Sequence, residues 1–336
     1  MFVCLLLLLA IVNILALTPI SAKNELISSI IDIETIFDSL QGWVKNAGGR
    51  VDDRLSLVSE TPWATRRGII TKKKINPVSV WPLVIVPESL EINGRRARAS
   101  LEEKLPRRAR SLDGLDSAAL IVLWLAAECA TGKQFDSSPW KPYLQSLPSE
   151  PPCGWYIASS EDALCNALFK QQVFDENHSI FRQETERAQQ YVQLVSQGLF
   201  NDYAHFFSIQ SPDLIAWALG IVSSRSMGGD ANSARLVPLL DLINHNVSSR
   251  PFTSFDAAGV NAIERFDSTN TNAIQQAALS LDGDDWALYP PPFHLAPGDE
   301  ITANYLHDSD YTILDWWIQT GFCPNEFLSS PRSSAS

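Results

Sequence analysis

The segment from Arg235 to Asn246, Arg-Leu-Val-Pro-Leu-Leu-Asp-Leu-Ile-Asn-His-Asn, constrains the fold more than any other part of the chain. An apolar run, interrupted by Asp241, ends abruptly in Asn244 and His245. Polar residues that follow such a run are informative, because they are seldom buried without a reason. A second segment, Pro297-Gly-Asp-Glu-Ile-Thr-Ala-Asn-Tyr305, comes about sixty residues later as a turn, an acidic pair and a short alternating strand. We expect the two segments to form two halves of one site.

Composition places this site in a well-packed globular protein. The chain has 336 residues, of which 45% are hydrophobic, with 10 Trp and 15 Phe. It is long enough for one large domain or two ordinary ones. The net charge is −12 and the pI is about 4.9. This balance argues against general nucleic-acid binding, which needs a basic face that displaces counterions.

Positive charge is concentrated in one part of the chain. Residues 66–110 contain 12 Lys and Arg against 4 Asp and Glu, a local charge of +8, so the remainder carries −20. A basic strip on an acidic protein can receive an acidic partner or shape a substrate channel. The alternative is a solvated surface of loops and helices.

The first 22 residues form a predicted secretory signal peptide. An apolar run of about 16 residues stops at Pro19, and Ser21 and Ala22 offer small residues for cleavage. The run is short for a spanning helix, and a signal anchor and a buried N-terminal helix are the alternatives. No other segment has the composition of a membrane span. We therefore expect the secretory pathway, with a plastid or cytoplasmic location as the alternative.

Cysteine and histidine usage predicts no metal site. The five cysteines and five histidines are dispersed, without metal-ligand spacing such as C-x-x-C. In an oxidising compartment the cysteines can form one or two disulfides. Two glycosylation sequons begin at Asn177 and Asn246, and a glycan on Asn246 would obstruct the neighbouring His245.

Hydrophobic periodicity divides the chain into strand-rich ends and a helical middle. We expect a strand-rich part with one leading helix in residues 23–99, a helical insert in residues 100–210, a second strand-rich part in residues 211–327, and a disordered tail in residues 328–336. The expected helices are residues 31–45, 115–130, 181–199, 213–225 and 312–319. The expected strands are residues 55–60, 67–71 and 80–86, with short strands resuming from Val237. Residues 140–148 form an expected proline-punctuated connection, and residues 267–272 an expected turn.

Five pieces of the sequence, in this order, resemble the SET-domain methyltransferases of the branch typified by the Rubisco large-subunit lysine methyltransferase. The pieces are Arg67-Gly-Ile-Ile-Thr71 with Lys74-Ile75, Trp140-Lys-Pro-Tyr-Leu-Gln-Ser-Leu-Pro148, Trp217-Ala-Leu-Gly-Ile-Val-Ser-Ser-Arg225, Asp241-Leu-Ile-Asn-His245 and Gly298-Asp-Glu-Ile-Thr-Ala-Asn-Tyr305. Each piece alone is a weak motif, and their common order gives the resemblance its specificity. It implies an α+β fold, the SET-domain β-clip of short sheets with a helical insert.

The resemblance also implies an activity. The family transfers a methyl group from S-adenosylmethionine to an amine, so we expect a monomeric protein-lysine N-methyltransferase that acts on a protein substrate. By the resemblance, Tyr305 is the catalytic tyrosine, and Arg225, Asp241 and Tyr305 bind the substrate. The cofactor-binding residues implied in the same way are Arg67, Gly68, Ile69, Arg225, Asn244, His245, Gly321 and Phe322.

Each of these residues also has an ordinary structural interpretation. Tyr305 can be a strand aromatic, His245 a core histidine and Asp241 a turn residue. Arg225 can cap the end of its helix, where cations are favoured. Their joint order favours the functional interpretation.

Several positions depart from the family pattern. Thr320-Gly-Phe322 stands where the family has Tyr-Gly-Phe, which leaves Trp316 and Trp317 as candidates for the second aromatic of the substrate channel. Arg66 replaces the opening glycine, and Leu306 and Asp310 replace the glycine and asparagine that follow the catalytic tyrosine. Nothing after residue 327 resembles the C-terminal domain with which the Rubisco large-subunit lysine methyltransferase and its relatives hold their substrates. These departures leave two alternatives, a catalytically weak protein-binding module and a protein-histidine N-methyltransferase.

Overall fold

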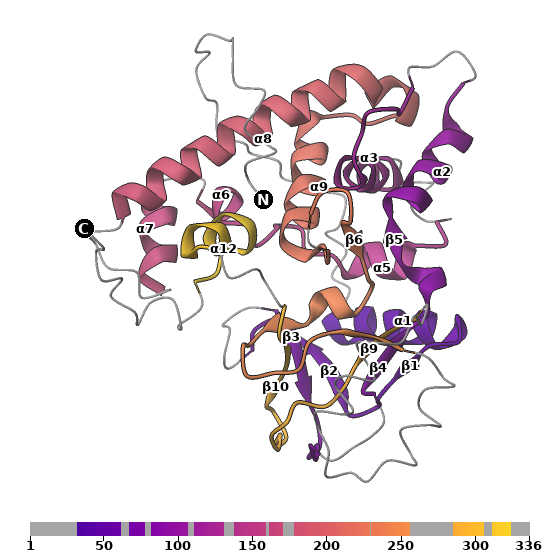
Figure 1. The fold of residues 1–336 in the computed structure, drawn as a ribbon, viewed down its shortest axis with the longest axis vertical. Helices are drawn as coiled ribbons and strands as arrows, with labels where there is room; N and C mark the ends of the chain where they lie inside the picture. The colour runs from indigo at the N-terminus through magenta and orange to yellow at the C-terminus, as the bar shows by residue number, and fades with distance from the viewer. Residues whose placement is uncertain are drawn as a thin grey trace.

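In the computed structural model, most strands gather at one end of the molecule with one long helix beside them, and most helices lie at the other end (Figure 1). The structure describes residues 32–61, 67–77, 82–106, 111–130, 138–158, 161–170, 178–228, 230–255, 285–305 and 311–323. The predicted leader, the predicted turn at residues 267–272 and the predicted tail lie outside these ranges. So do Asn177 and the departures at Arg66, Leu306 and Asp310.

Within the described residues, short strands form two four-stranded sheets and one two-stranded sheet. The first sheet has the order β1 (Arg50–Val51), β4 (Val84–Val86), β9 (Asp285–Leu288) and β8 (Thr253–Phe255). The second has the order β2 (Leu55–Val58), β3 (Gly68–Thr71), β10 (Glu300–Ala303) and β7 (Asn244–His245). The third pairs β5 (Ile92–Asn93) with β6 (Arg235–Leu236).

The pairing of β7 with β10 brings the two marked sequence segments together. These two strands run parallel, with Thr302 opposite Asn244 and Ala303 opposite His245, whereas the other strand pairs are antiparallel. A parallel pair needs a long connection between its strands. The chain therefore leaves β7, builds β8 and β9 in the other sheet, and returns as β10.

Helices cover and extend this strand-rich part. They are α1 (Ile33–Asn46), α2 (Gly94–Lys104), α3 (Ser117–Cys129), α5 (Lys141–Ser146), α6 (Gly154–Ile157), α7 (Glu161–Lys170), α8 (His178–Phe207), α9 (Pro212–Arg225) and α12 (Ile313–Thr320), with short 3-10 turns η3 (Glu88–Leu90) and η5 (Leu240–Leu242). Capping residues set several ends, and Asp116 accepts the Ala119 N–H at the start of α3. Thr312 and Asp315 form a capping box that begins α12.

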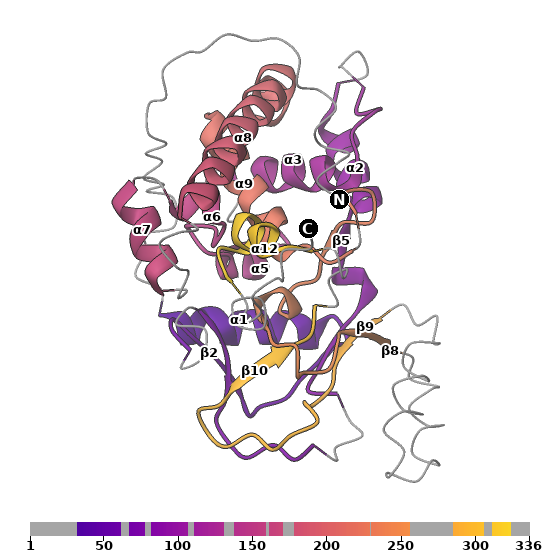
Figure 2. The same ribbon diagram turned by 60° about the vertical axis from the view of Figure 1, so that its left-hand side comes forward.

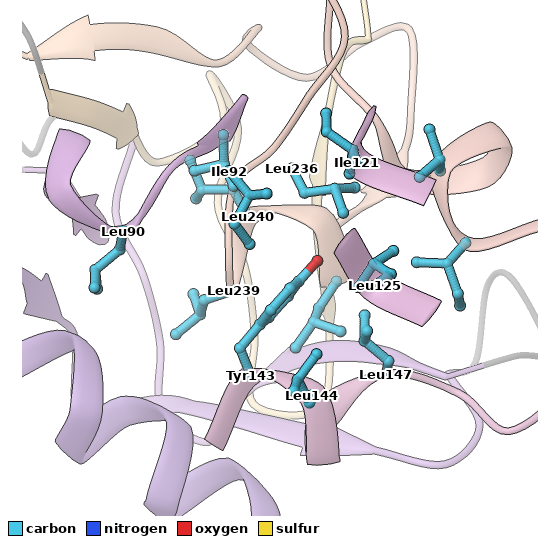
Figure 3. Close-up of a cluster of buried hydrophobic side chains, with 14 of the residues drawn as sticks. Leu90, Ile92, Ile121, Leu125, Tyr143, Leu144, Leu147, Leu236, Leu239 and Leu240 are labelled. Atoms are coloured by element: carbon cyan, nitrogen blue, oxygen red, sulfur yellow. The ribbon is translucent and has the colours of Figure 1, made fainter. Parts of the chain in front are cut away.

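One continuous core joins the sheets to α1, α2, α3, α5 and α9. Helix α3 is apolar on every side, and residues 120–127 are all buried, as expected for a helix inside a core. Figure 3 shows the ring of Tyr143 of α5 within this core, among leucine and isoleucine side chains. A second cluster, which includes Trp155, Phe181, Val192 and Trp317, fills the space between α6, α8 and α12. Helix α12 packs against α6, α8 and α9 (Figure 2), so the last described helix is tied to the helical middle of the chain.

Most predicted elements are confirmed with small shifts at their ends, including the helices now named α1, α3, α9 and α12. The long polar helix is longer than predicted, from His178 to Phe207. The strand predicted at residues 80–86 is shorter, since only Val84–Val86 is described as strand.

Two predictions need correction. Residues 140–148 contain the helix α5 rather than a plain connection, because Pro142 occupies its first turn, where a missing N–H costs nothing. Short strands do resume in the region around Val237, as β6 and β7, but none begins at Val237 itself. Leu239 instead has a positive φ of 72° and leads into η5. This conformation is costly for a branched residue, and it holds Asp241 in a tight turn.

The described part of the chain contains Cys129, Cys153, Cys165 and Cys323, all as thiols. The disulfides that the sequence allowed do not form among them. No single described helix is long and apolar enough to span a membrane, whereas α8 and α9 meet that criterion only as a pair bent by 108°.

Candidate functional site

A cavity of about 270 Å³ lies where the end of β10 and strand β7 meet α9 and α12. It contains five of the predicted site residues: Arg67, Arg225, Asp241, Asn244 and Tyr305. The other lining residues are Ser59, Pro148, Glu150, Pro152, Ser224, Leu242, Trp316 and Thr320. Segments from separate parts of the sequence therefore share one site.

Asn244 and Glu300 form a buried pair across the β7–β10 pairing. Nδ2 of Asn244 donates to Oε1 of Glu300 at 2.6 Å and to the backbone carbonyl of Arg67 at 3.2 Å. A Cβ at Gly68 would lie 2.6 Å from Asn244 Nδ2 and 2.9 Å from Glu300 Oε1. Only glycine leaves room for this close approach of β3 to the pair.

Asp241 is buried in the wall of the cavity, with 8% of its surface exposed. Oδ2 accepts a hydrogen bond of 2.7 Å from the hydroxyl of Tyr143, and Nη1 of Arg225 donates to the Asp241 backbone carbonyl at 2.7 Å. Burial raises the pKa of Asp241, while Arg225 and the Tyr143 hydrogen bond oppose the rise. The pKa of Tyr143 is raised well above its ordinary value by burial and by Asp241.

Three charged groups in the cavity wall hold buried polar atoms that form no hydrogen bond within the described protein. They are Nε and Nη2 of Arg67, Nε of Arg225, and Oδ1 of Asp241. Burial and the nearby charge of Arg225 together lower the pKa of Arg67 to about 10, while Asp241 opposes the shift. A buried polar atom without a partner is costly, so these atoms are suited to a polar ligand.

Tyr305 closes another side of the cavity, directly after β10. Its hydroxyl donates to the carbonyl of Ile243 at 2.5 Å, and its N–H donates to Nδ1 of His245 at 3.2 Å. The imidazole of His245 lies against Trp316, with ring centroids 4.6 Å apart, and does not itself line the cavity. His245 thus supports the tyrosine and the tryptophan from behind.

The two tryptophans of α12 point to different places. Trp316 lines the cavity and stacks on Tyr305 at 6.2 Å with an interplanar angle of 22°. Trp317 is fully buried in the second cluster and donates to Oγ1 of Thr185 in α8 at 2.9 Å. Trp316 is therefore the aromatic residue beside Tyr305, and Thr320 bonds back to the Trp316 carbonyl.

Four further residues predicted to bind the cofactor, Gly68, Ile69, Gly321 and Phe322, do not line the cavity. Ile69 is fully buried and pairs with Leu57 and Ile301 in the second sheet. Gly321 ends α12 with a φ of +62°, where a Cβ would lie 2.2 Å from the Pro152 carbonyl. Phe322 packs edge-on against Trp316 at 6.3 Å. Their contacts with a cofactor stay predictions.

Two residues outside the predicted site, Tyr143 and Glu300, hold Asp241 and Asn244 from behind the cavity. Tyr143 lay within a recognised motif, and Glu300 lay in the acidic pair before the alternating strand. No local pattern, however, pairs either residue with a partner so distant in sequence.

The basic strip has no single role. Arg67 enters the cavity, whereas Lys72, Lys73 and Lys74 are exposed to solvent. Arg96 instead donates to the carbonyls of Glu88 and Ser89, at 3.0 and 2.8 Å. The solvated-surface interpretation therefore holds for the three lysines.

Chemically, the cavity combines unpaired guanidinium donors, an unpaired carboxylate oxygen and a tyrosine hydroxyl. Such groups can bind an anion and orient a hydrogen-bond donor. Among the described residues there is no cluster of three or more His, Cys, Asp or Glu that could hold a metal ion.

Comparison of the sequence finds no matching protein-family model and no matching curated protein. Solved structures do match. The SET domain of LSMT bound to lysine and AdoHcy has a TM-score of 0.60 and 19% identity, covering 88% of this chain and 58% of that chain. Rubisco LSMT bound to AdoMet has a TM-score of 0.57 and 19% identity, covering 86% of this chain and 56% of that chain.

Rubisco LSMT bound to sinefungin and monomethyllysine matches with a TM-score of 0.56 and the same identity. The match with these proteins thus spans somewhat more than half of their length. At 19% identity the similarity concerns the fold alone, and it covers 86–88% of this chain. The chain therefore has the fold of a SET domain, as in the SET-domain methyltransferases that its sequence motifs resemble.

Proposed function

We propose that the protein transfers a methyl group from S-adenosylmethionine to a lysine side chain of a protein substrate. The observation that carries this proposal is the parallel pairing of β7 and β10, which places Asn244 and Tyr305 on one cavity. Solved structures of similar fold include complexes with AdoMet, AdoHcy or sinefungin, and some of these complexes also contain lysine or monomethyllysine.

The cavity wall suits the amino-acid end of this cofactor. That end carries a carboxylate and an ammonium group. The unpaired nitrogen atoms of Arg67 and Arg225 are donors for the former, and Oδ1 of Asp241 is an acceptor for the latter. When bound, S-adenosylmethionine supplies an electrophilic methyl group on a sulfonium that leaves as a thioether.

The protein's own part in the reaction is alignment and exclusion of water. Because the Tyr305 hydroxyl donates its proton to the Ile243 carbonyl, its lone pairs are directed to accept an N–H from an incoming amine. The rings of Tyr305 and Trp316 lie stacked beside the cavity. Burial and the two guanidinium charges both favour the neutral form of an amine, which is the nucleophile.

The partners and the compartment belong to the same proposal. We expect a monomer that acts on a protein and does not bind nucleic acid, given the net charge of −12. The leader-like residues 1–22 favour entry into the secretory pathway, with a plastid or cytoplasmic location as the alternative. Asn246, the sequon asparagine beside His245, is half-buried, and its Oδ1 accepts the Ser248 N–H at 2.9 Å.

Methyl labelling tests the proposal. The purified chain is incubated with a protein extract and S-adenosylmethionine that carries a labelled methyl group, beside Tyr305→Phe. We expect label on lysine in the wild-type reaction and a strong loss of label with the variant. Mass spectrometry of the labelled peptides identifies the acceptor.

Two other outcomes contradict the proposal. Label on histidine would make the protein a histidine methyltransferase. Equal background labelling by both proteins would favour a protein-binding module on the same fold.

A further inference from the structure

Arg67 occupies the cavity wall in a way that the sequence did not predict. The family resemblance implies that the strand at Arg67-Gly68-Ile69 brings backbone groups near the cofactor. In the structure the Arg67 carbonyl is already used, since it accepts the Asn244 side-chain amide at 3.2 Å. The side chain lines the cavity instead.

The two unpaired nitrogen atoms of this guanidinium are Nε and Nη2. These atoms form the side edge of the group and present two parallel N–H bonds. Two parallel N–H bonds match the two oxygens of one carboxylate, which is the bidentate arrangement that arginine favours and lysine cannot form. The side edge of Arg67 is therefore shaped for a planar anion.

The charged groups around the cavity also favour binding of an anion. Arg67 and Arg225 face the cavity together with the buried carboxyl of Asp241, whereas Glu150, the other acidic residue of the lining, is exposed to solvent. No ion pair is formed between Asp241 and either arginine among the described residues, and one Asp241 oxygen is taken by Tyr143. Two cations with one buried and partly engaged anion leave an uncompensated positive charge, which is unfavourable without a ligand.

We propose that Arg67 is a specificity-determining residue that binds the α-carboxylate of the cofactor side-on, as a second cation beside Arg225. This inference rests on the proposed function, because it assigns the anion to the amino-acid end of S-adenosylmethionine. Asn244 then acts as a positioning residue, since its hydrogen bond to the Arg67 carbonyl fixes the backbone from which the guanidinium extends. A carboxylate of the substrate is the alternative anion that Arg67 would bind.

The test measures binding of two ligands by calorimetry to the full chain and to Arg67→Met. One ligand is S-adenosylhomocysteine, and the other is the same thioether with hydrogen in place of the α-carboxylate. We expect Arg67→Met to weaken binding of S-adenosylhomocysteine roughly ten- to a hundredfold, as for a lost hydrogen-bonded charge. Binding of the decarboxylated ligand should change by less than about twofold, because it has no group for Arg67 to bind.

Two further variants separate this role from a structural one. Arg67→Lys keeps the positive charge but lacks the two parallel N–H bonds of the guanidinium, so it should restore only part of the affinity. Arg187→Met, on the exposed face of α8 where Arg187 pairs with Glu184, should leave both affinities unchanged. Without ligand, Arg67→Met should be at least as stable as the wild type, because it removes an unpaired buried charge.

Each remaining outcome has a definite meaning. Equal weakening of both ligands, or no weakening of either, would overturn the role of Arg67 while leaving the proposed function intact. Failure of the wild-type protein to bind either ligand would overturn the proposed function and this inference with it.

Discussion

The side-chain amide of Asn244 donates a 2.6 Å hydrogen bond to Oε1 of Glu300, both residues being buried. This bond crosses the parallel pairing of β7 and β10, and Gly68 of β3 packs against both of its ends. The contact fixes the relative position of three strands on which the cavity is built. Its geometry leaves no space for a larger residue at Gly68.

Replacing Gly68 by alanine tests that close approach. The new Cβ would lie 2.6 Å from Asn244 Nδ2, so the strands must move apart. We expect a loss of about 1–3 kcal/mol in the free energy of unfolding, as for other overpacked cores. Gly42→Ala is the matched control, because nothing lies within 4 Å of a Cβ there and the site is inside α1. It should be neutral or stabilising by up to about 1 kcal/mol. Urea unfolding measures both, and equal stabilities would refute the packing argument.

Tyr305→Phe removes the hydroxyl and keeps the ring that packs against His245 and Trp316. We expect kcat to fall about a hundredfold, because the amine loses its orienting acceptor. Affinity for S-adenosylhomocysteine should stay within about twofold. Tyr191→Phe on α8, away from the cavity, should keep full activity. A Tyr305→Phe protein with wild-type kcat would remove Tyr305 from the mechanism.

Tyr143→Phe removes the hydrogen bond to Asp241 at 2.7 Å. Burial already holds the folded-state pKa of Asp241 above its ordinary 3.8. The stability contributed by this carboxyl is therefore complete below about pH 3.8 and is lost as pH rises through the folded-state pKa. Removing the hydroxyl raises that pKa further, so the variant should lose more stability toward neutral pH.

At pH 7 we expect Tyr143→Phe to cost about 1–3 kcal/mol, and less at pH 4. Urea titrations of the wild type and the variant from pH 4 to pH 8 measure the difference. In an Asp241→Asn background the partner cannot ionise, so the cost of Tyr143→Phe should be the same at every pH. A pH-dependent cost in that background would assign the effect to another group.

Substitutions of the two neighbouring tryptophans of α12 should affect ligand binding and stability differently. Trp316 lines the cavity, whereas Trp317 is bonded to Thr185 in the second cluster. Addition of S-adenosylhomocysteine should change the intrinsic fluorescence of the wild type, because a ligand in the cavity lies beside Trp316. This change should be lost in Trp316→Phe and kept in Trp317→Phe. Trp317→Phe should instead lower the melting temperature, since it leaves the buried Thr185 hydroxyl without its partner. The reverse pattern would place the ligand elsewhere.

Much of the fold could be predicted because its elements carry local signals. Helix α3 is continuously apolar, and α12 begins with a capping threonine and ends at Gly321. The segments around Asn244 and Tyr305 were identified from their order in the chain, and the structure brings both to one cavity. Local signals could not give the turn at Leu239, because its positive φ depends on the packing around it.

The remaining features depend on contacts between distant residues. Tyr143 and Asp241 are 98 positions apart, and Asn244 and Glu300 are 56 positions apart. A single sequence contains no signal that pairs them. The same holds for the hydrogen bond from Asn244 to the Arg67 carbonyl, which joins residues 177 positions apart. Likewise, the choice of Trp316 over Trp317 is set by the direction in which α12 packs against α6, α8 and α9.

Calorimetric titration of the full chain with S-adenosylmethionine tests the central claim most directly. We expect saturable binding with one site per chain, weakened at least about tenfold by Arg225→Met, which removes a donor from the cavity wall. No binding at millimolar cofactor would contradict it, because the SET-domain fold would then be present without the cofactor site that Asn244, Arg225 and Tyr305 are proposed to form.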